Sequence, residues 1–129
     1  MPIYNRQFKM LNDKNTFMLW YELGTLKRVV THLTAEGIVN SKTSKPITPY
    51  AIWISAMRFV MENPDEAYPM YVKAGSPMTR EEWEVWLIKK AMRIYGLQGK
   101  SRFFLWLRRF GYDEKHKEVY SKTFGVDEL

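Results

Sequence analysis

Apolar positions recur at helical spacing along most of this chain. In residues 26–36 the apolar side chains lie three or four positions apart, at Leu26, Val29, Val30 and Leu33. This spacing puts them on one side of a helix, with Lys27 and Arg28 on the other side. Thr25 precedes the stripe as an N-cap residue, and Gly37 follows it with the freedom to take a positive φ. The pattern therefore predicts a helix over residues 26–36.

N-cap signals also mark the starts of two longer helices. Thr48 followed by Pro49 combines a hydroxyl N-cap with a proline at the first helical position. Thr79 and Glu82 have the spacing of a capping box, in which each side chain bonds the backbone N–H of the other residue. These signals predict helices that begin at residues 49 and 80.

Helices are expected over residues 17–23, 26–36, 49–62, 80–95, 102–110 and 114–124. Thr16 and Asp113 are assigned as the N-caps of the first and the last of these helices. A short irregular helix, broken by Pro69, is expected within residues 65–74. The fold class predicted is mainly α, a compact bundle of about five to six short helices.

The polar segment 38–47 interrupts this helical pattern and is expected to form a loop or a small β-hairpin, which would act as a wing. The whole chain, residues 1–129, is of a length that fits one domain. Within it we distinguish a helix-turn-helix-like N-terminal half, 15–64, from a basic-aromatic helical C-terminal half, 79–125. The Gly-Ser-Pro sequence at 75–77 separates the two halves.

Composition narrows the functional classes. The chain has no Cys, so disulfides and thiolate metal sites are impossible. We expect no signal peptide and no membrane span, because no apolar run reaches roughly 18 residues, and we expect a cytoplasmic protein. No motif of a nucleophile, a phosphate loop or a zinc protease is found, so neither an enzyme nor a cofactor or metal is expected.

The net charge of +6 is unevenly distributed along the chain. Residues 1–48 hold seven Lys or Arg and three acidic residues, a net of +4, and residues 79–125 hold eleven and six, a net of +5. Residues 49–78, with two basic and three acidic residues, are close to neutral. Two basic regions of this kind favour a polyanionic partner, because attraction to phosphates needs only local positive potential.

Residues 24–64 carry a recognisable sequence pattern. Its positions are Val30, Leu33, Thr34, Gly37, Ile38, Thr43, Pro46, Thr48, Ile52, Asn63 and Pro64. This pattern resembles the helix-turn-helix "recombinase" DNA-binding segment of large serine recombinases, and that of related small phage and mobile-element DNA-binding proteins. The resemblance implies a helix-turn-helix placed against DNA and nothing beyond DNA binding. It implies no strand-exchange chemistry. The role of a phage or mobile-element regulator is a separate expectation.

The expected helix over residues 49–62 is unusually apolar for one that reads bases. Such a helix is normally buried, as the central helix of a bundle. If one face is exposed instead, it presents Trp53, Met57 and Met61, and such a surface suits a protein partner. The alternative function is therefore a protein-interaction module, a small regulator or inhibitor of a larger machine.

Residues 100–110 interleave cations with aromatic rings. At helical spacing Phe103, Trp106 and Phe110 share one face, and an aromatic stripe of this kind is usually core. The cations then form the solvated face of the same helix. The combination also suits single-stranded nucleic acid, which binds by stacking on rings within a cationic groove, whereas duplex binding needs only the cations.

The function expected from the sequence is that of a small, basic nucleic-acid-binding protein, with duplex DNA as the first candidate partner. The residues expected to contact nucleic acid are Lys42, Lys45, Tyr50, Arg58, Lys100, Arg102, Arg108 and Arg109. The alternative is the protein partner bound through Trp53, Met57 and Met61.

Overall fold

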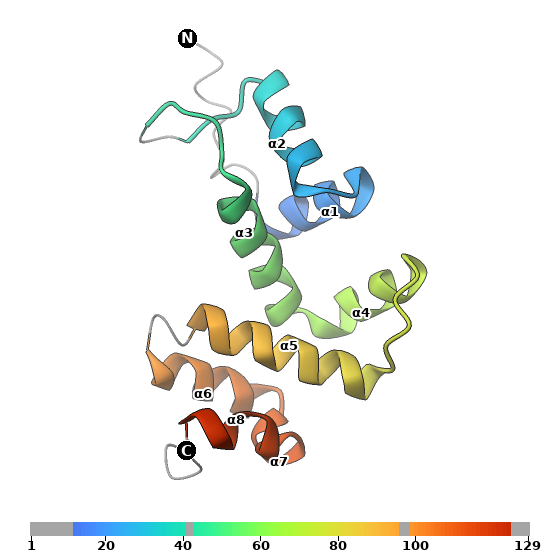
Figure 1. Cartoon of the computed structure of the whole chain (residues 1–129), viewed down its shortest axis with the longest axis vertical. Coiled ribbons are helices and arrows are strands. Elements are labelled where there is room, and N and C mark those ends of the chain that lie inside the picture. The colour runs from blue at the N-terminus through green and yellow to red at the C-terminus, as the bar shows by residue number, and fades with distance from the viewer. Residues whose placement is uncertain (1–11, 41–42, 96–98, 125–129) are drawn as a thin grey trace. The chain divides into compact units, whose positions relative to one another are not determined.

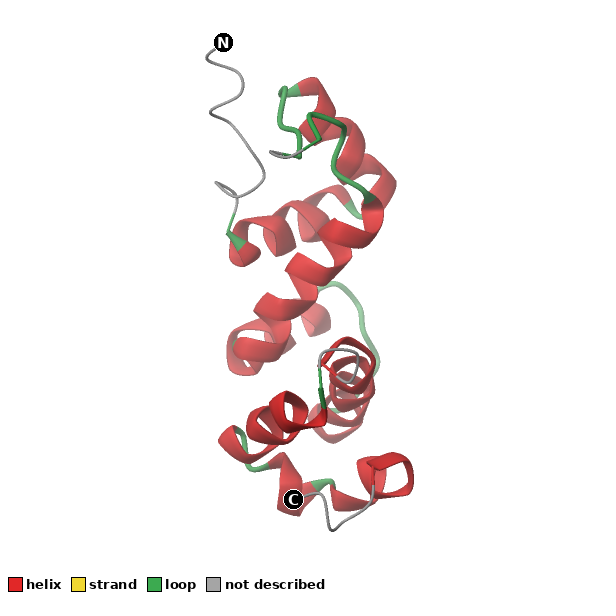
Figure 2. Cartoon of the chain, turned by 90° about the vertical axis from the view of Figure 1, so that its left-hand side faces the viewer, coloured by secondary structure: helices red, strands yellow, loops and turns green. Residues whose placement is uncertain are grey.

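The computed structural model describes residues 12–40, 43–95 and 99–124 of the 129-residue chain (Figure 1). Within these ranges the chain forms eight helices and no named strand (Figure 2). The helices are α1 (Asp13–Leu23), α2 (Leu26–Ala35), α3 (Pro49–Glu62), α4 (Pro64–Lys73), α5 (Arg80–Tyr95), α6 (Lys100–Arg109), α7 (Tyr112–Lys115) and α8 (Lys117–Phe124). The prediction of a mainly α fold is confirmed, with more helices than expected. None of these helices is long and apolar enough to cross a membrane.

The chain divides into two compact units, Met1–Ala67 and Tyr68–Leu129, with the division inside α4. In the first unit, α3 packs against both α1 and α2. A buried cluster joins α2, the connector and α3 through Val29, Leu33, Ile38, Ile47 and Ile52. The rings of Phe17 and Phe59 lie 5.1 Å apart and link α1 to α3. α3 is therefore the central helix of this unit.

The first helix begins four residues earlier than the sequence indicated. Asn12, not Thr16, is its N-cap, and the Asn12 side chain accepts a 2.8 Å hydrogen bond from the Asn15 N–H. Thr16 is buried inside the helix, where its hydroxyl donates to the Asn12 carbonyl. The assignment of Thr16 as the cap was wrong because residues 13–16 hold no apolar position that would reveal the first turn.

Two threonine caps are confirmed. Thr25 and Thr48 both have extended backbones, and their hydroxyls accept from the N–H groups of Arg28 and Ala51, each at 3.1 Å. α3 runs over the predicted residues, and α2 ends one residue earlier than predicted, with Glu36 as its C-cap. Gly37 follows with a φ of 73°, which glycine adopts without steric cost.

Replacement of Thr48 by alanine is expected to lower the free energy of unfolding by about 1 kcal/mol, because the first turn of α3 loses its hydroxyl acceptor. The matched control is Thr31→Ala, since the Thr31 hydroxyl bonds the Lys27 carbonyl within α2 and caps nothing. Urea unfolding compares the two variants. An equal effect of both would contradict the capping role of Thr48.

The connector between α2 and α3 forms no hairpin wing in its described part. A single antiparallel bridge pairs Val39 with Pro46, and the Asn40 N–H donates to the Lys45 carbonyl at 2.9 Å. Ser44 takes a positive φ of 59° between them. Buried Ile38 and Ile47 anchor the two ends of the connector in the core. The expected wing is thus reduced to one bridge, because the proline has no N–H to extend a ladder.

The second unit is built around α5, which packs against α6 and α8. The capping box at its start is confirmed, with Thr79 N–H donating to Glu82 at 2.9 Å and Glu82 N–H donating to Thr79 at 3.2 Å. Rings fill much of the interior. Tyr120 of α8 contacts Phe103 and Phe104 of α6 edge-on, with ring centroids 6.1 and 5.8 Å apart.

Pro69 does not break α4, contrary to expectation. The helix continues through it from Pro64 to Lys73. The residues on either side of Pro69 are held by α5 and the segment before it. Tyr68 donates a 2.8 Å hydrogen bond to the Met78 carbonyl, and the rings of Tyr68 and Tyr71 lie against Trp83. These contacts offset the backbone hydrogen bond that proline cannot make.

The C-terminal region also differs from the prediction. α6 starts and ends earlier, at Lys100–Arg109, and the expected helix 114–124 is split into α7 and α8. Asp113 lies inside α7 rather than at an N-cap, which Gly111 occupies with a φ of 73°. The break falls at His116, which has a non-helical φ of −126°. The side chain of His116 is bonded to α5, and that bond fixes the position of the break.

Candidate nucleic-acid interface

The exposed side of α6 is almost entirely cationic. Four side chains of this helix are buried and face the core of the second unit, namely Phe103, Phe104, Trp106 and Leu107. The exposed ones are Lys100, Ser101, Arg102, Leu105, Arg108 and Arg109. We call these six residues the α6 basic face. Their sequence contains no acidic residue, so the face carries four positive charges and no internal compensation.

Helical spacing gathers this face around one apolar side chain. Leu105 is 62% exposed. Arg102 lies three positions before it, while Arg108 and Arg109 lie three and four positions after it, so all of them are neighbours on the helix surface. The rise of 1.5 Å per residue puts Arg102 and Arg109 about 10 Å apart along the axis. A face of this kind offers several cations to a polyanion at once.

Aromatic rings of the second unit hold two of these arginines. The guanidinium of Arg102 lies 5.2 Å from the ring centroid of Tyr95, and that of Arg109 lies 4.8 Å from that of Phe110. Both distances are within the range of a cation–π attraction. A cation–π contact leaves the charge of the guanidinium group in place.

The aromatic stripe of α6 belongs to the core, as its spacing indicated. Phe103 and Trp106 are 0% and 3% exposed. Trp106 contacts Tyr95 and Tyr112 edge-on, with centroids 6.4 and 5.5 Å apart. Phe110 is half-buried, and its ring stacks on that of Tyr112. These rings are engaged with one another and offer no open platform for an unpaired base.

The expected contact residues of the first unit do not form a comparable face. Lys45 is exposed on the connector, and Tyr50 is 63% exposed at the start of α3, its ring 6.0 Å from that of Trp53. Arg58 lies two turns further along α3 and forms a 3.4 Å ion pair with Asp13 of α1. Lys42 lies outside the described residues.

Half of α3 is buried in the core of the first unit. Seven of its fourteen residues are buried, which confirms that it is a core helix. Met57 and Met61 are 1% and 0% exposed, and Trp53 is half-buried. The expectation that these three side chains form a surface for a protein partner was wrong, because the central position of α3 buries both methionines. The same position leaves few side chains that could reach base edges.

A buried charge network joins α5 to the break between α7 and α8, and sequence reasoning missed it. Glu84 is 3% exposed and accepts from His116 Nε2 and Arg80 Nε, each at 2.8 Å. Lys115 Nζ lies 3.0 Å from both Glu84 and Glu81. The sequence did contain a signal: Glu84 precedes Leu87 and Ile88 by three and four positions, on the buried side of α5.

Burial raises the pKa of Glu84, but the hydrogen bonds from His116, Arg80 and Lys115 outweigh burial and bring its pKa below the ordinary value. Glu81 and then Glu84 raise the pKa of Lys115 through hydrogen bonds. Glu84 is therefore an ionised carboxylate that ties α5 to the α7–α8 junction. The junction lies at the end of α7, which packs against α6.

The same residues include a set that could hold a metal ion. Ligand atoms of Glu81, Glu84 and His116 lie within 4.8 Å of one another. Arg80 and Lys115 already compensate both carboxylates, and a metal ion would have to displace at least one of these cations. The arrangement is that of an ion-pair network. It is chemically complete without a metal.

Comparison of the chain with protein-family models, with curated proteins and with solved structures found no match. The resemblance of residues 24–64 to recombinase segments therefore stays a prediction.

Proposed function

We propose that this protein binds nucleic acid, with duplex DNA as the partner, through phosphate contacts made by the α6 basic face. The observation that supports this is the composition of the exposed side of α6, which carries four cations and no acidic residue, three of the cations being neighbours of Leu105 on the helix surface. Phosphate contacts require this local excess of positive charge and no particular base sequence. The rings of Tyr95 and Phe110 contact the guanidinium groups of Arg102 and Arg109 and restrict both side chains.

A duplex suits this surface better than a single strand. Single-strand binding gains much of its affinity from bases that stack on exposed rings. The rings of α6 are buried, and the exposed large apolar residue on this helix is Leu105. Affinity must therefore come mainly from charge, and a duplex presents about twice the density of phosphates along its axis.

The resemblance in the first unit points to the same class of partner. Exposed Lys45 and Tyr50 are the described residues there that favour a further contact with the duplex. The protein-interaction alternative loses its surface, because Met57 and Met61 are buried. That the chain is not an enzyme remains a prediction.

The experiment that tests the proposal is a salt series. Purified protein is titrated into fluorescent duplex and single-stranded DNA, and anisotropy gives the association constant at each salt concentration. If each of the four cations neutralises one phosphate, the plot of log affinity against log salt should have a slope of about −3.6 for the duplex. Weaker binding to the single strand is also expected. No binding at about 50 mM salt, or a flat slope, would refute the proposal.

A further inference from the structure

Leu105 lies in the middle of the α6 basic face and is 62% exposed. Its neighbours on the helix surface, three or four positions away, are Ser101, Arg102, Arg108 and Arg109. A single exposed leucine is common on protein surfaces. The surroundings of this one matter, because a duplex that contacts the cations on both sides of Leu105 must also cover the leucine. The proposed contact therefore buries an apolar side chain at its centre.

Phosphate groups alone do not suit this leucine. A phosphate is charged and hydrated, and an apolar side chain placed against it removes water without offering a hydrogen bond in return. Burial of Leu105 stabilises the complex where the duplex presents apolar surface. Among the groups that base pairs expose in the grooves, the apolar one is the C5-methyl group of thymine, which lies in the major groove.

The width of a helix selects the same groove. An α-helix with its side chains is about 10–12 Å across, close to the roughly 12 Å width of the major groove and well above the roughly 6 Å width of the minor groove. The ten residues of α6 extend over about 15 Å along the helix axis. Leu105 is near the middle of this length, so it reaches the bases when the exposed side of α6 lies in the major groove.

We infer that the exposed side of α6 lies in the major groove, where Leu105 contacts the methyl group of a thymine and Arg108 bonds a guanine. The inference rests on the proposed function and deepens it, because it adds a preference for base sequence to the phosphate contacts. The leucine and the methyl group exclude water from each other, and a base pair that lacks the methyl group offers no such gain.

Arg108 is assigned to guanine by its position and its chemistry. It is exposed and lies three positions after Leu105, about 4.5 Å further along the helix axis. Side chains at this spacing on a helix in the major groove reach successive base pairs. A guanidinium group donates two parallel hydrogen bonds to O6 and N7 of guanine. The guanidinium groups of Arg102 and Arg109 lie on aromatic rings, and these two residues stay assigned to the phosphates.

Replacement of thymine by uracil tests the leucine contact, because uracil pairs in the same way and lacks only the methyl group. Two fluorescent duplexes with alternating thymine and guanine on one strand are compared, one of them with uracil at every thymine position. Anisotropy gives both association constants at about 0.1 M salt. The natural protein is expected to bind the thymine duplex about fourfold more tightly, which is the effect of one buried methyl group.

Leu105→Ala should bind the two duplexes equally, because the alanine side chain is too short to reach the thymine methyl group. Alanine favours helix, so α6 should keep its conformation, and the salt slope should stay the same. Val72→Ala is the matched control, since Val72 is an apolar side chain of α4 with 47% exposure. This control should keep the fourfold preference for thymine.

Replacement of guanine by 7-deazaguanine, which lacks N7, tests the arginine contact. The natural protein should bind this duplex about fivefold more weakly, because one hydrogen bond to a charged donor is lost. Arg108→Ala should lose the difference between the two duplexes. Lys89→Ala, which removes the same charge from an exposed position of α5, should keep it. A guanine preference that survives in Arg108→Ala would overturn the assignment of this residue.

Failure of this inference and failure of the proposed function are distinguishable. Equal binding of the thymine and uracil duplexes by the natural protein would overturn the inference. Equal weakening of both duplexes by Leu105→Ala would also overturn it, and would place the leucine against sugars or in the minor groove. A steep salt slope in either case would leave the phosphate contacts standing. Absence of duplex binding at about 50 mM salt would refute the proposed function and the inference together.

Discussion

Replacement of Glu84 by alanine is expected to destabilise the second unit by about 3 kcal/mol, toward the lower end of the cost of breaking a buried charged pair. Three side chains lose their shared acceptor at once. His116 is 8% exposed, so solvent has little access to its ring to replace the lost carboxylate. The side chains of Arg80 and Lys115 are 32% and 46% exposed, so water solvates them, and this keeps the loss from being larger.

The contribution of Glu84 should depend on pH in a defined direction. Its pKa is lower in the folded protein than the ordinary value of 4.5. The unfolded chain therefore binds a proton more readily than the folded one as pH falls, and unfolding is favoured. The stabilisation is fully present above the ordinary carboxyl pKa and is lost as pH falls through the lower pKa of the folded state. The difference in stability between the natural protein and Glu84→Gln should narrow over the same interval.

Urea unfolding followed at the amide signals of α5 measures both effects, because it reports on the second unit separately from the first. Glu118→Ala is the control, since Glu118 is an exposed carboxylate of α8 and its loss should change stability by less than about 0.5 kcal/mol. If Glu84→Ala lowers the free energy of unfolding no more than the control does, the network contributes little to stability. The same conclusion follows if the difference in stability between the natural protein and Glu84→Gln does not vary with pH.

Local signals in the sequence placed the helices well. Thr25, Thr48 and the Thr79–Glu82 box each form the cap that was predicted, because a cap depends on residues a few positions apart. The failures have tertiary causes. Neither the continuation of α4 through Pro69 nor the break at His116 follows from neighbouring residues. Both depend on side chains of α5, which local patterns do not reveal.

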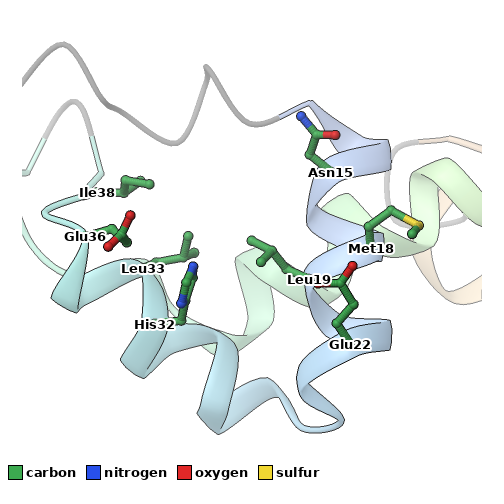
Figure 3. Close-up of a pocket in the computed structure, with 8 residues that line it drawn as sticks. All are labelled: Asn15, Met18, Leu19, Glu22, His32, Leu33, Glu36 and Ile38. Carbon is green, nitrogen blue, oxygen red and sulfur yellow. The ribbon is translucent and has the colours of Figure 1, made fainter.

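Of the candidate sites, one could be predicted from local sequence and the others depend on tertiary packing. The cationic face of α6 follows from helical spacing, because the buried aromatic stripe leaves only the opposite side for the arginines. The Glu84 network needs the packing of α5 against the α7–α8 junction, and the two partners are 32 residues apart in sequence. The pocket between α1 and α2 likewise exists only once the two helices are packed, because its lining residues come from both helices and the connector (Figure 3).

Removal of three charges from the α6 basic face is expected to weaken duplex binding by about two to three orders of magnitude at 0.1 M salt. The variant is Arg102→Gln, Arg108→Gln and Arg109→Gln combined. If each arginine neutralises one phosphate, the salt slope should become less steep by about 2.7, which corresponds to that loss of affinity. Loss of the ring contacts of Arg102 and Arg109 should cost only about 0.5–1 kcal/mol each in stability, so the fold should persist, as far-UV circular dichroism would show.

The control must separate the position of the charges from their number. Lys27→Gln, Lys73→Gln and Lys89→Gln combined remove the same net charge from exposed positions on α2, α4 and the outer side of α5. Long-range attraction falls equally in the two triple variants, whereas direct phosphate contacts are lost only from α6. A steep slope retained by the control and lost by the α6 variant would locate the interface on this helix. Equal slopes in both variants would mean that net charge alone attracts the duplex, and that the arrangement of arginines around Leu105 has no role in binding it.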